Sequence, residues 1–159
     1  MKVFISHKQE DAQIALDLAA QLKRNGVSYY LDVLDTSIVG DGKKLTDHIK
    51  AELNDCSDIM VVMSEKTKLS QWVYFEIGMS AQKNMPTVTY LKEDVALPAF
   101  LSFWPRLKRT TDVDTYVITR RRIKAQFDAE YRGMVAFASE RKTAELKAFY
   151  TALRAALQL

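Results

Sequence analysis

Short β-rich runs alternate with amphipathic stretches along the first 91 residues, and this alternation limits the fold more than any other feature of the sequence. The predicted strands cover residues 3–5, 27–31, 59–63 and 87–91. Between the first two, Ile14, Leu18 and Leu22 recur at helical spacing. A connection of that length predicts that the two strands are parallel. The repeated pattern therefore predicts a doubly wound α/β sheet.

The other two intervening stretches also have helical patterns. The second carries Cys56 on its apolar face, which favours a small core residue over a nucleophile. The third follows Ser70, a good N-cap residue, and continues to about Lys83. Residues 59–63 form a continuous apolar run, which is typical of a parallel strand that helices cover on both faces.

The pattern weakens after residue 98. Residues 103–107 are predicted as a short edge strand, since proline is tolerated at sheet edges. Residues 112–157 carry two helical stripes, either separated by a polar break at residues 139–143 or joined in one long bent helix. The first stripe consists of Ile123, Phe127, Tyr131, Met134 and Val135, and the second of Leu146, Phe149, Tyr150, Leu153 and Leu157.

The expected fold is flavodoxin-like: a parallel five-stranded sheet in the order 2-1-3-4-5 with right-handed crossovers and a C-terminal helical extension. A length of 159 residues fits one domain, with a core over about residues 1–110 and a helical part over about residues 112–157.

Composition argues against several protein classes. The single cysteine cannot form an internal disulfide, and no Cys/His cluster has zinc-site spacing. No apolar run approaches the roughly 18–20 residues of a membrane helix. We therefore expect a cytoplasmic protein with no metal site and no membrane segment.

Positive charge is concentrated in the last third of the chain. Residues 1–100 carry 11 Lys/Arg and 14 Asp/Glu, whereas residues 101–159 carry 12 and 6. The cluster at Arg120, Arg121, Arg122 and Lys124 has no accompanying motif for reading nucleic acid. It is interpreted as a solvated helix face, and no nucleic-acid partner is expected.

Ligands of open α/β sheets bind at the carboxyl ends of the strands. The sequence places Ser6, His7 and Lys8 there, together with a loop over residues 32–42 and the segment 64–72. No G-x-G-x-x-G follows the first strand, which disfavours hydride transfer. The two histidines have no evident acid partner, so a catalytic triad is not supported.

Trp72 and Glu76 are four residues apart near the start of the third helix, and therefore project from the same face. Their neighbours are nearly all apolar. The residue pattern leaves two readings of Glu76 open. It lies at the edge of a cleft, or it points to solvent from a helix that is otherwise buried.

Three segments resemble Toll/interleukin-1 receptor (TIR) domains in the family's order. Val3 to Asp11 resembles the first box of the family, Val39-Gly40-Asp41-Gly42 its second-strand loop, and Trp72 to Glu76 the W-x-x-x-E motif of its NAD-cleaving branch. The resemblance covers about residues 1–110. The three segments resemble those of free-standing bacterial TIR proteins, such as the TIR proteins of Thoeris-like antiphage systems or similar effectors.

The resemblance implies cleavage of the nicotinamide–ribose bond of NAD, which is then a substrate and not a cofactor. Nicotinamide leaves as a neutral molecule, so one carboxylate, Glu76, is enough to stabilise an oxocarbenium-like transition state. Trp72 would stack on a flat base, or would only fill the core. The products would be nicotinamide with ADP-ribose or with a cyclic ADP-ribose-type signal.

The remaining candidate substrate contacts come from the strand ends and the second-strand loop. They are Ser6, His7, Lys8, Asp32, Gly40, Lys43 and Lys44. A solvated loop explains each lysine nearly as well.

The resemblance also implies self-association through residues 32–42 and the third helix, and a downstream protein that senses the nucleotide product. The main alternative is a non-catalytic scaffold that binds other TIR domains; another is a virulence effector that interferes with host TIR signalling. The W-x-x-x-E spacing favours the enzyme. With no receptor, death-domain or linker segment in the sequence, a free-standing effector is expected.

Overall fold

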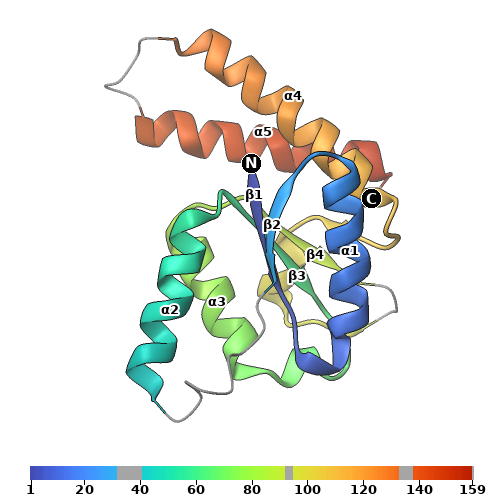
Figure 1. Cartoon of the computed structure of the whole chain (residues 1–159). Coiled ribbons are helices and arrows are strands. Elements are labelled where there is room, and N and C mark those ends of the chain that lie inside the picture. The colour runs from blue at the N-terminus through green and yellow to red at the C-terminus, as the bar shows by residue number, and fades with distance from the viewer. Residues whose placement is uncertain (32–40, 92–94, 133–137, 159) are drawn as a thin grey trace.

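A parallel five-stranded sheet forms the centre of the computed structural model, which describes residues 1–31, 41–91, 95–132 and 138–158 (Figure 1). The strands are β1 (Lys2–Ser6), β2 (Ser28–Leu31), β3 (Asp58–Val62), β4 (Thr87–Tyr90) and β5 (Arg106–Leu107). Their spatial order is β2-β1-β3-β4-β5, and every pairing is parallel. The predicted sheet order and the parallel pairing of the first two strands are confirmed.

Helices cover both faces of the sheet (Figure 1). The described α-helices are α1 (Ala12–Arg24), α2 (Gly42–Asp55), α3 (Gln71–Gln82), α4 (Asp112–Glu130) and α5 (Ala138–Leu157), with short 3-10 helices η1 (Gln9–Asp11), η2 (Thr67–Leu69) and η3 (Ala99–Phe103). None of the helices in these parts of the chain is long and apolar enough to cross a membrane.

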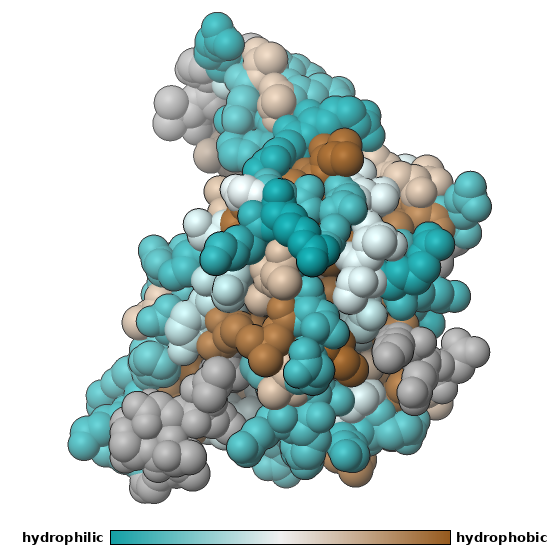
Figure 2. All heavy atoms as spheres, turned by 45° about the vertical axis from the view of Figure 1, so that its right-hand side comes forward, coloured by the Kyte–Doolittle hydropathy of each residue, from teal (hydrophilic) through white to brown (hydrophobic). Residues whose placement is uncertain are grey.

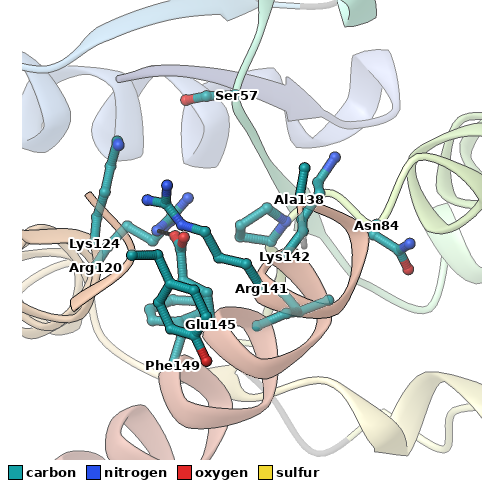
Figure 3. A pocket seen from close by; sticks show the side chains of 12 residues that line it. Ser57, Asn84, Arg120, Lys124, Ala138, Arg141, Lys142, Glu145 and Phe149 are labelled. Atoms are coloured by element: carbon teal, nitrogen blue, oxygen red, sulfur yellow. Dashed lines mark hydrogen bonds and ion pairs between the residues drawn. The ribbon is translucent and has the colours of Figure 1, made fainter. Parts of the chain in front are cut away.

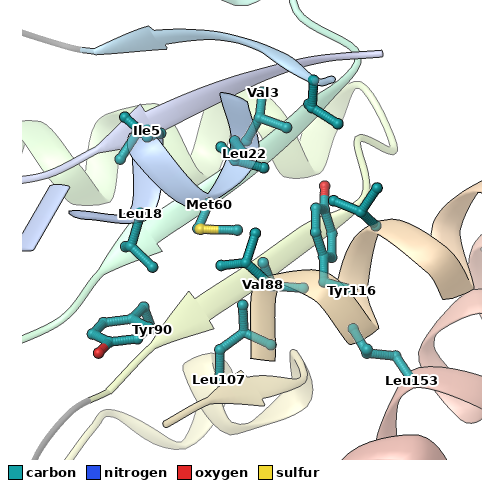
Figure 4. Packing of buried hydrophobic residues seen from close by; sticks show 14 of the residues in the cluster. Val3, Ile5, Leu18, Leu22, Met60, Val88, Tyr90, Leu107, Tyr116 and Leu153 are labelled. Atoms are coloured by element: carbon teal, nitrogen blue, oxygen red, sulfur yellow. The ribbon is translucent and has the colours of Figure 1, made fainter. Parts of the chain in front are cut away.

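Side chains of alternate strand residues pack into two separate hydrophobic cores. Val3 and Ile5 of β1 pack with α1, α4 and α5, whereas Phe4 between them packs with α2 and α3. Figure 4 shows the first of these cores, with Leu18 of α1 and Tyr116 of α4 facing the sheet. This division explains why β3 is apolar throughout: all five of its residues are buried, and its two faces contact different cores.

Local sequence signals end and begin the helices where expected. Gly26 follows α1 with a φ of +63°, a conformation that glycine adopts without steric cost. The Ser70 hydroxyl accepts the Val73 amide at the start of α3, which confirms the predicted N-cap. Cys56 lies in the second core, and burial raises the pKa of its thiol to about 11, as expected for a core residue.

Two predictions for the C-terminal region differ from the structure. The predicted edge strand at 103–107 is only the two residues of β5, because Phe103 belongs to η3 and Pro105 offers only a carbonyl, which accepts the Thr89 amide. The predicted break at residues 139–143 is wrong, since these residues form the first turns of α5. They are polar because this part of the helix is largely exposed, not because the helix ends there.

The helices α4 and α5 form a hairpin at the end of the sheet where the strands begin (Figure 1). Ile123 and Phe127 of the first predicted stripe are buried, as are Phe149, Tyr150 and Leu153 of the second. Met134 and Val135 lie outside the described residues. Figure 2 shows mainly hydrophilic residues on the visible face of the projecting hairpin, at the top of the view.

Candidate active site at the carboxyl ends of the strands

Glu76 lies on the inner face of α3 and contacts the end of β1. Its carboxylate accepts a hydrogen bond from the hydroxyl of Ser6, the last residue of that strand. Both side chains are fully buried, at 0% exposure. The reading in which Glu76 points to solvent is therefore wrong, and the helix places this carboxylate at the edge of the sheet where α/β proteins bind ligands.

A second polar cluster fixes the segment between β3 and α3. Asp11 of η1 is buried and accepts hydrogen bonds from the hydroxyls of Ser64 and Thr67. The Ser64 oxygen in turn accepts the amides of Lys66 and Thr67. The segment that leads into the helix of Glu76 is thus tied to the segment that follows Ser6. In the sequence, Asp11 was identified only as the last residue of the first TIR-like box. Its contacts with Ser64 and Thr67 were not predicted.

Trp72 is half-buried one turn before Glu76. Its ring packs edge-on against Phe75, with the ring centroids 5.4 Å apart, and contacts the second hydrophobic core. Part of the indole remains exposed. The arrangement is compatible with both predicted roles, a core contact and a stacking surface for a ligand.

The other candidate side chains make local contacts. His7 is buried, with its Nδ1 3.4 Å from the carbonyl oxygen of Ile5. Lys8 pairs with Glu10 at 2.9 Å, and Lys43 pairs with Asp47 one turn along α2 at 2.6 Å. The hydrogen bond from Asp47 raises the pKa of Lys43, whose side chain is exposed. Lys44 contacts Asp41, the N-cap of its own helix. Asp32 and Gly40 lie outside the described residues.

Glu76 lines none of three pockets found among the described residues. One, of about 220 Å³, lies beside the Asp11 cluster and is lined by Asp11, Ser64 and Lys66 among others. The other two, of about 440 and 330 Å³, both include Ser57 and Arg120 and lie at the opposite end of the sheet. Because the Glu76 carboxylate is covered, a ligand can reach it only if the groups around it move.

Within the described parts of the chain, no three His, Cys, Asp or Glu side chains come close enough together to hold a metal ion. What the site offers is a buried carboxylate, a hydroxyl donor and a nearby aromatic ring. Such a set can stabilise developing positive charge and hold a polyhydroxylated group.

Comparison with known proteins identifies the family. A model of the TIR domain matches residues 3–127, which include the five strands and most of α4. The chain belongs to the TIR domain family. No curated protein sequence gives a significant match.

Solved structures show the same fold at low sequence identity. The TIR domain of the Toll-related receptor TRR-2 from Hydra magnipapillata is 17% identical, with a TM-score of 0.55 over 78% of this chain and 95% of that one. A 2-deoxyribosyltransferase from Bacillus psychrosaccharolyticus is 12% identical, with a TM-score of 0.60 over 73% of this chain and 92% of that one. The TIR family match ends in α4, so α5 lies beyond it.

Proposed function

We propose that this TIR domain cleaves NAD between nicotinamide and ribose, with Glu76 as the catalytic residue. The observation that carries the proposal is the position of Glu76. A carboxylate of the W-x-x-x-E segment is fully buried at the carboxyl end of β1 and accepts a hydrogen bond from Ser6. A wholly solvated glutamate would offer no such environment for catalysis.

The chemistry fits a single carboxylate. As the bond to nicotinamide breaks, positive charge develops on the ribose ring, and the departing ring becomes neutral without receiving a proton. Attraction between Glu76 and that charge would be much stronger in this water-poor site than in bulk water. Water or the adenine of the same molecule would then attack the ribose, giving ADP-ribose or a cyclic product.

Two further groups have roles in this proposal. Ser6 would position the carboxylate through its hydrogen bond, and the exposed part of Trp72 would stack on a flat ring of the substrate. Related support comes from the 2-deoxyribosyltransferase, an enzyme with a similar fold whose name describes transfer of a deoxyribosyl group.

Self-association is proposed as part of the activity, because the covered carboxylate must become accessible. Leu69 at the end of η2 and Phe75 in α3 are large apolar residues with 76% and 38% exposure. A second copy that covers them would contact the helix that carries Glu76, which agrees with the proposed self-association through residues 32–42 and the third helix. We propose that assembly exposes Glu76. We also propose that the protein acts in bacterial antiphage defence, and that a second protein senses the nucleotide product.

The decisive assay measures nicotinamide release from NAD by the purified protein. Glu76→Gln keeps the side-chain volume but removes the charge, and should lose the activity. Glu140→Gln is the matched control, because Glu140 is exposed on α5 far from Ser6. Folded wild-type protein that releases no nicotinamide at any concentration would favour the scaffold alternative, for which the exposed apolar residues Leu69 and Phe75 are the supporting observation.

A further inference from the structure

The pocket of about 440 Å³ lies at the end of the sheet opposite Glu76. The hairpin of α4 and α5 forms one wall, and residues just before β3 and β4, including Ser57 and Asn84, form the other. Figure 3 shows the side chains of Arg120 and Lys124 from α4 and of Arg141 and Lys142 from α5 gathered around the same hollow. Its volume is within the range of small-molecule sites, about 300–1,000 Å³.

The cations around this pocket outnumber the acids that neutralise them. Lys124 and Arg141 share one carboxylate, that of Asp128. Lys142 donates to a backbone carbonyl, that of Lys83, at 2.6 Å. Four cations line the pocket, Arg120 included, and they contact three carboxylates, those of Asp58, Asp128 and Glu145. A phosphate group could replace the carbonyl contact of Lys142 and share Arg141, since cations bind phosphate through strong charge-assisted hydrogen bonds.

Arg120 gives the pocket a rigid wall. Its guanidinium pairs with Asp58 at 2.8 Å and with Glu145 at 2.7 Å, and it lies 5.6 Å from the centre of the Phe149 ring. The side chain is therefore held in place before any ligand arrives. Leu146 and the partly exposed ring of Tyr131 complete the lining, whereas Phe149 beside Arg120 is fully buried. A pocket with an excess of positive charge and an aromatic wall suits a molecule with both a phosphate and a flat ring.

We propose that this pocket binds a small phosphorylated molecule of nucleotide size, at a site separate from Glu76. A hollow bounded by the hairpin on one side and by residues before β3 and β4 on the other favours a small ligand over a nucleic-acid strand, which needs an extended basic groove. The site also lies partly on α5, beyond the TIR family match. A ligand bound there would contact both the TIR family match and the helix beyond it.

The test compares two double variants with the same loss of charge. Arg141→Gln/Lys142→Gln removes two pocket cations and leaves the Arg120 contacts intact. Arg122→Gln/Lys147→Gln removes two exposed cations from the same helices outside the pocket lining. Binding of AMP, inorganic phosphate, uncharged adenosine and a short single-stranded RNA is measured by calorimetry, and chemical shifts of the backbone amides locate the ligand. Nicotinamide release from NAD is measured in parallel.

AMP should bind wild-type protein and the control variant equally, and the pocket variant at least tenfold more weakly, as expected for loss of one charge-assisted contact of about 1.4 kcal/mol. Adenosine should bind at least tenfold more weakly than AMP, and the shifts should lie around Asn84 and Arg141. NAD cleavage should be the same in both variants. Four results would each overturn the proposal. The first two are equal affinity for adenosine and AMP, and equal losses of AMP affinity in both double variants. The others are chemical-shift changes confined to Ser6 and Glu76, and tighter binding of single-stranded RNA than of AMP.

Discussion

Two buried carboxylates lie at opposite ends of the same sheet, and the contacts around them differ. Asp58 begins β3 and accepts hydrogen bonds from Tyr116 and Arg120. Glu76 lies beside the end of β1 and accepts a hydrogen bond from Ser6. Both are fully buried, so both carboxyl groups have lost contact with bulk water.

The Asp58 network joins the central strand to the C-terminal hairpin. Arg120 bridges from Asp58 to Glu145 on α5, so a single guanidinium connects β3, α4 and α5. Although burial alone would lower it, the neighbouring Asp58 and Glu145 raise the pKa of Arg120 above its ordinary value. This charge pairing is what a structural role requires, because a buried ion without compensation destabilises the fold.

Asp58 and Glu76 together show that burial of a carboxylate does not by itself indicate function. Asp58 is anchored by an opposite charge at the amino ends of the strands, whereas Glu76 lies at the carboxyl ends, where this fold class binds substrates. We therefore expect disruption of the Asp58 network to reduce stability, and disruption of Glu76 to reduce catalysis. The following predictions separate these effects.

Arg120→Ala should lower the free energy of unfolding by about 3–5 kcal/mol, because it leaves Asp58 and Glu145 without their shared cation. Urea denaturation measures the change. Arg122→Ala, on the exposed side of the same helix, should stay within about 0.5 kcal/mol of wild type. Equal stability of the two variants would show that the buried network does not hold the hairpin to the sheet.

Glu76→Gln should reduce the rate constant for nicotinamide release by about a hundred- to a thousandfold, equivalent to about 3–4 kcal/mol of lost electrostatic stabilisation. The affinity for NAD should change much less, since the charge acts on the transition state. The melting temperature should remain close to that of wild type, because glutamine conserves volume and helix propensity. A variant with full activity and normal melting would reverse the assignment and leave Glu76 a structural residue like Asp58.

Ser6→Ala tests the hydrogen bond that positions Glu76. Loss of one donor to a buried carboxylate costs about 1–3 kcal/mol, so we expect about a tenfold lower catalytic rate in protein that still folds. Ser80→Ala, one turn further along α3, is the matched control because its hydroxyl donates to the Ile77 carbonyl of its own helix. Equal rates in the two variants would remove Ser6 from the proposed site.

Most of the fold could be predicted from the sequence, since its signals are local. The apolar run of β3, the Ser70 N-cap and Gly26 each depend on a few neighbouring residues, and the sheet order follows from connection rules. The edge strand and the helix boundaries near residue 138 depend on tertiary contacts and were placed incorrectly. The polar first turns of α5 resemble a loop in sequence, but lie on an exposed helix surface.

The site was predicted less completely, because side-chain pairing across the sequence has no local signal. The Ser6–Glu76 contact joins residues 70 positions apart, and nothing in the pattern alone chooses between a buried and a solvated Glu76. Arg120 was interpreted as part of a solvated basic face, which is correct for its exposed neighbours Arg121 and Arg122 but wrong for Arg120 itself. The apolar stripe of α4, with Tyr116, Ile123 and Phe127, turns Arg120 inward, and Asp58 supplies its partner there.

The smallest expected effect concerns assembly. Leu69 is 76% exposed at the end of η2, just before α3, so Leu69→Ser should leave the monomer stable but remove apolar area from a contact between copies. If association exposes Glu76, specific activity rises with protein concentration, and the variant should need about fivefold more protein to reach half of its maximal activity, equivalent to about 1 kcal/mol. Ile118→Ser is the control, because Ile118 is 64% exposed on α4, away from α3. Activity that is independent of concentration in wild type would show that Glu76 becomes accessible within one molecule. If both variants raise the protein concentration needed for half-maximal activity equally, the contact between copies does not involve Leu69.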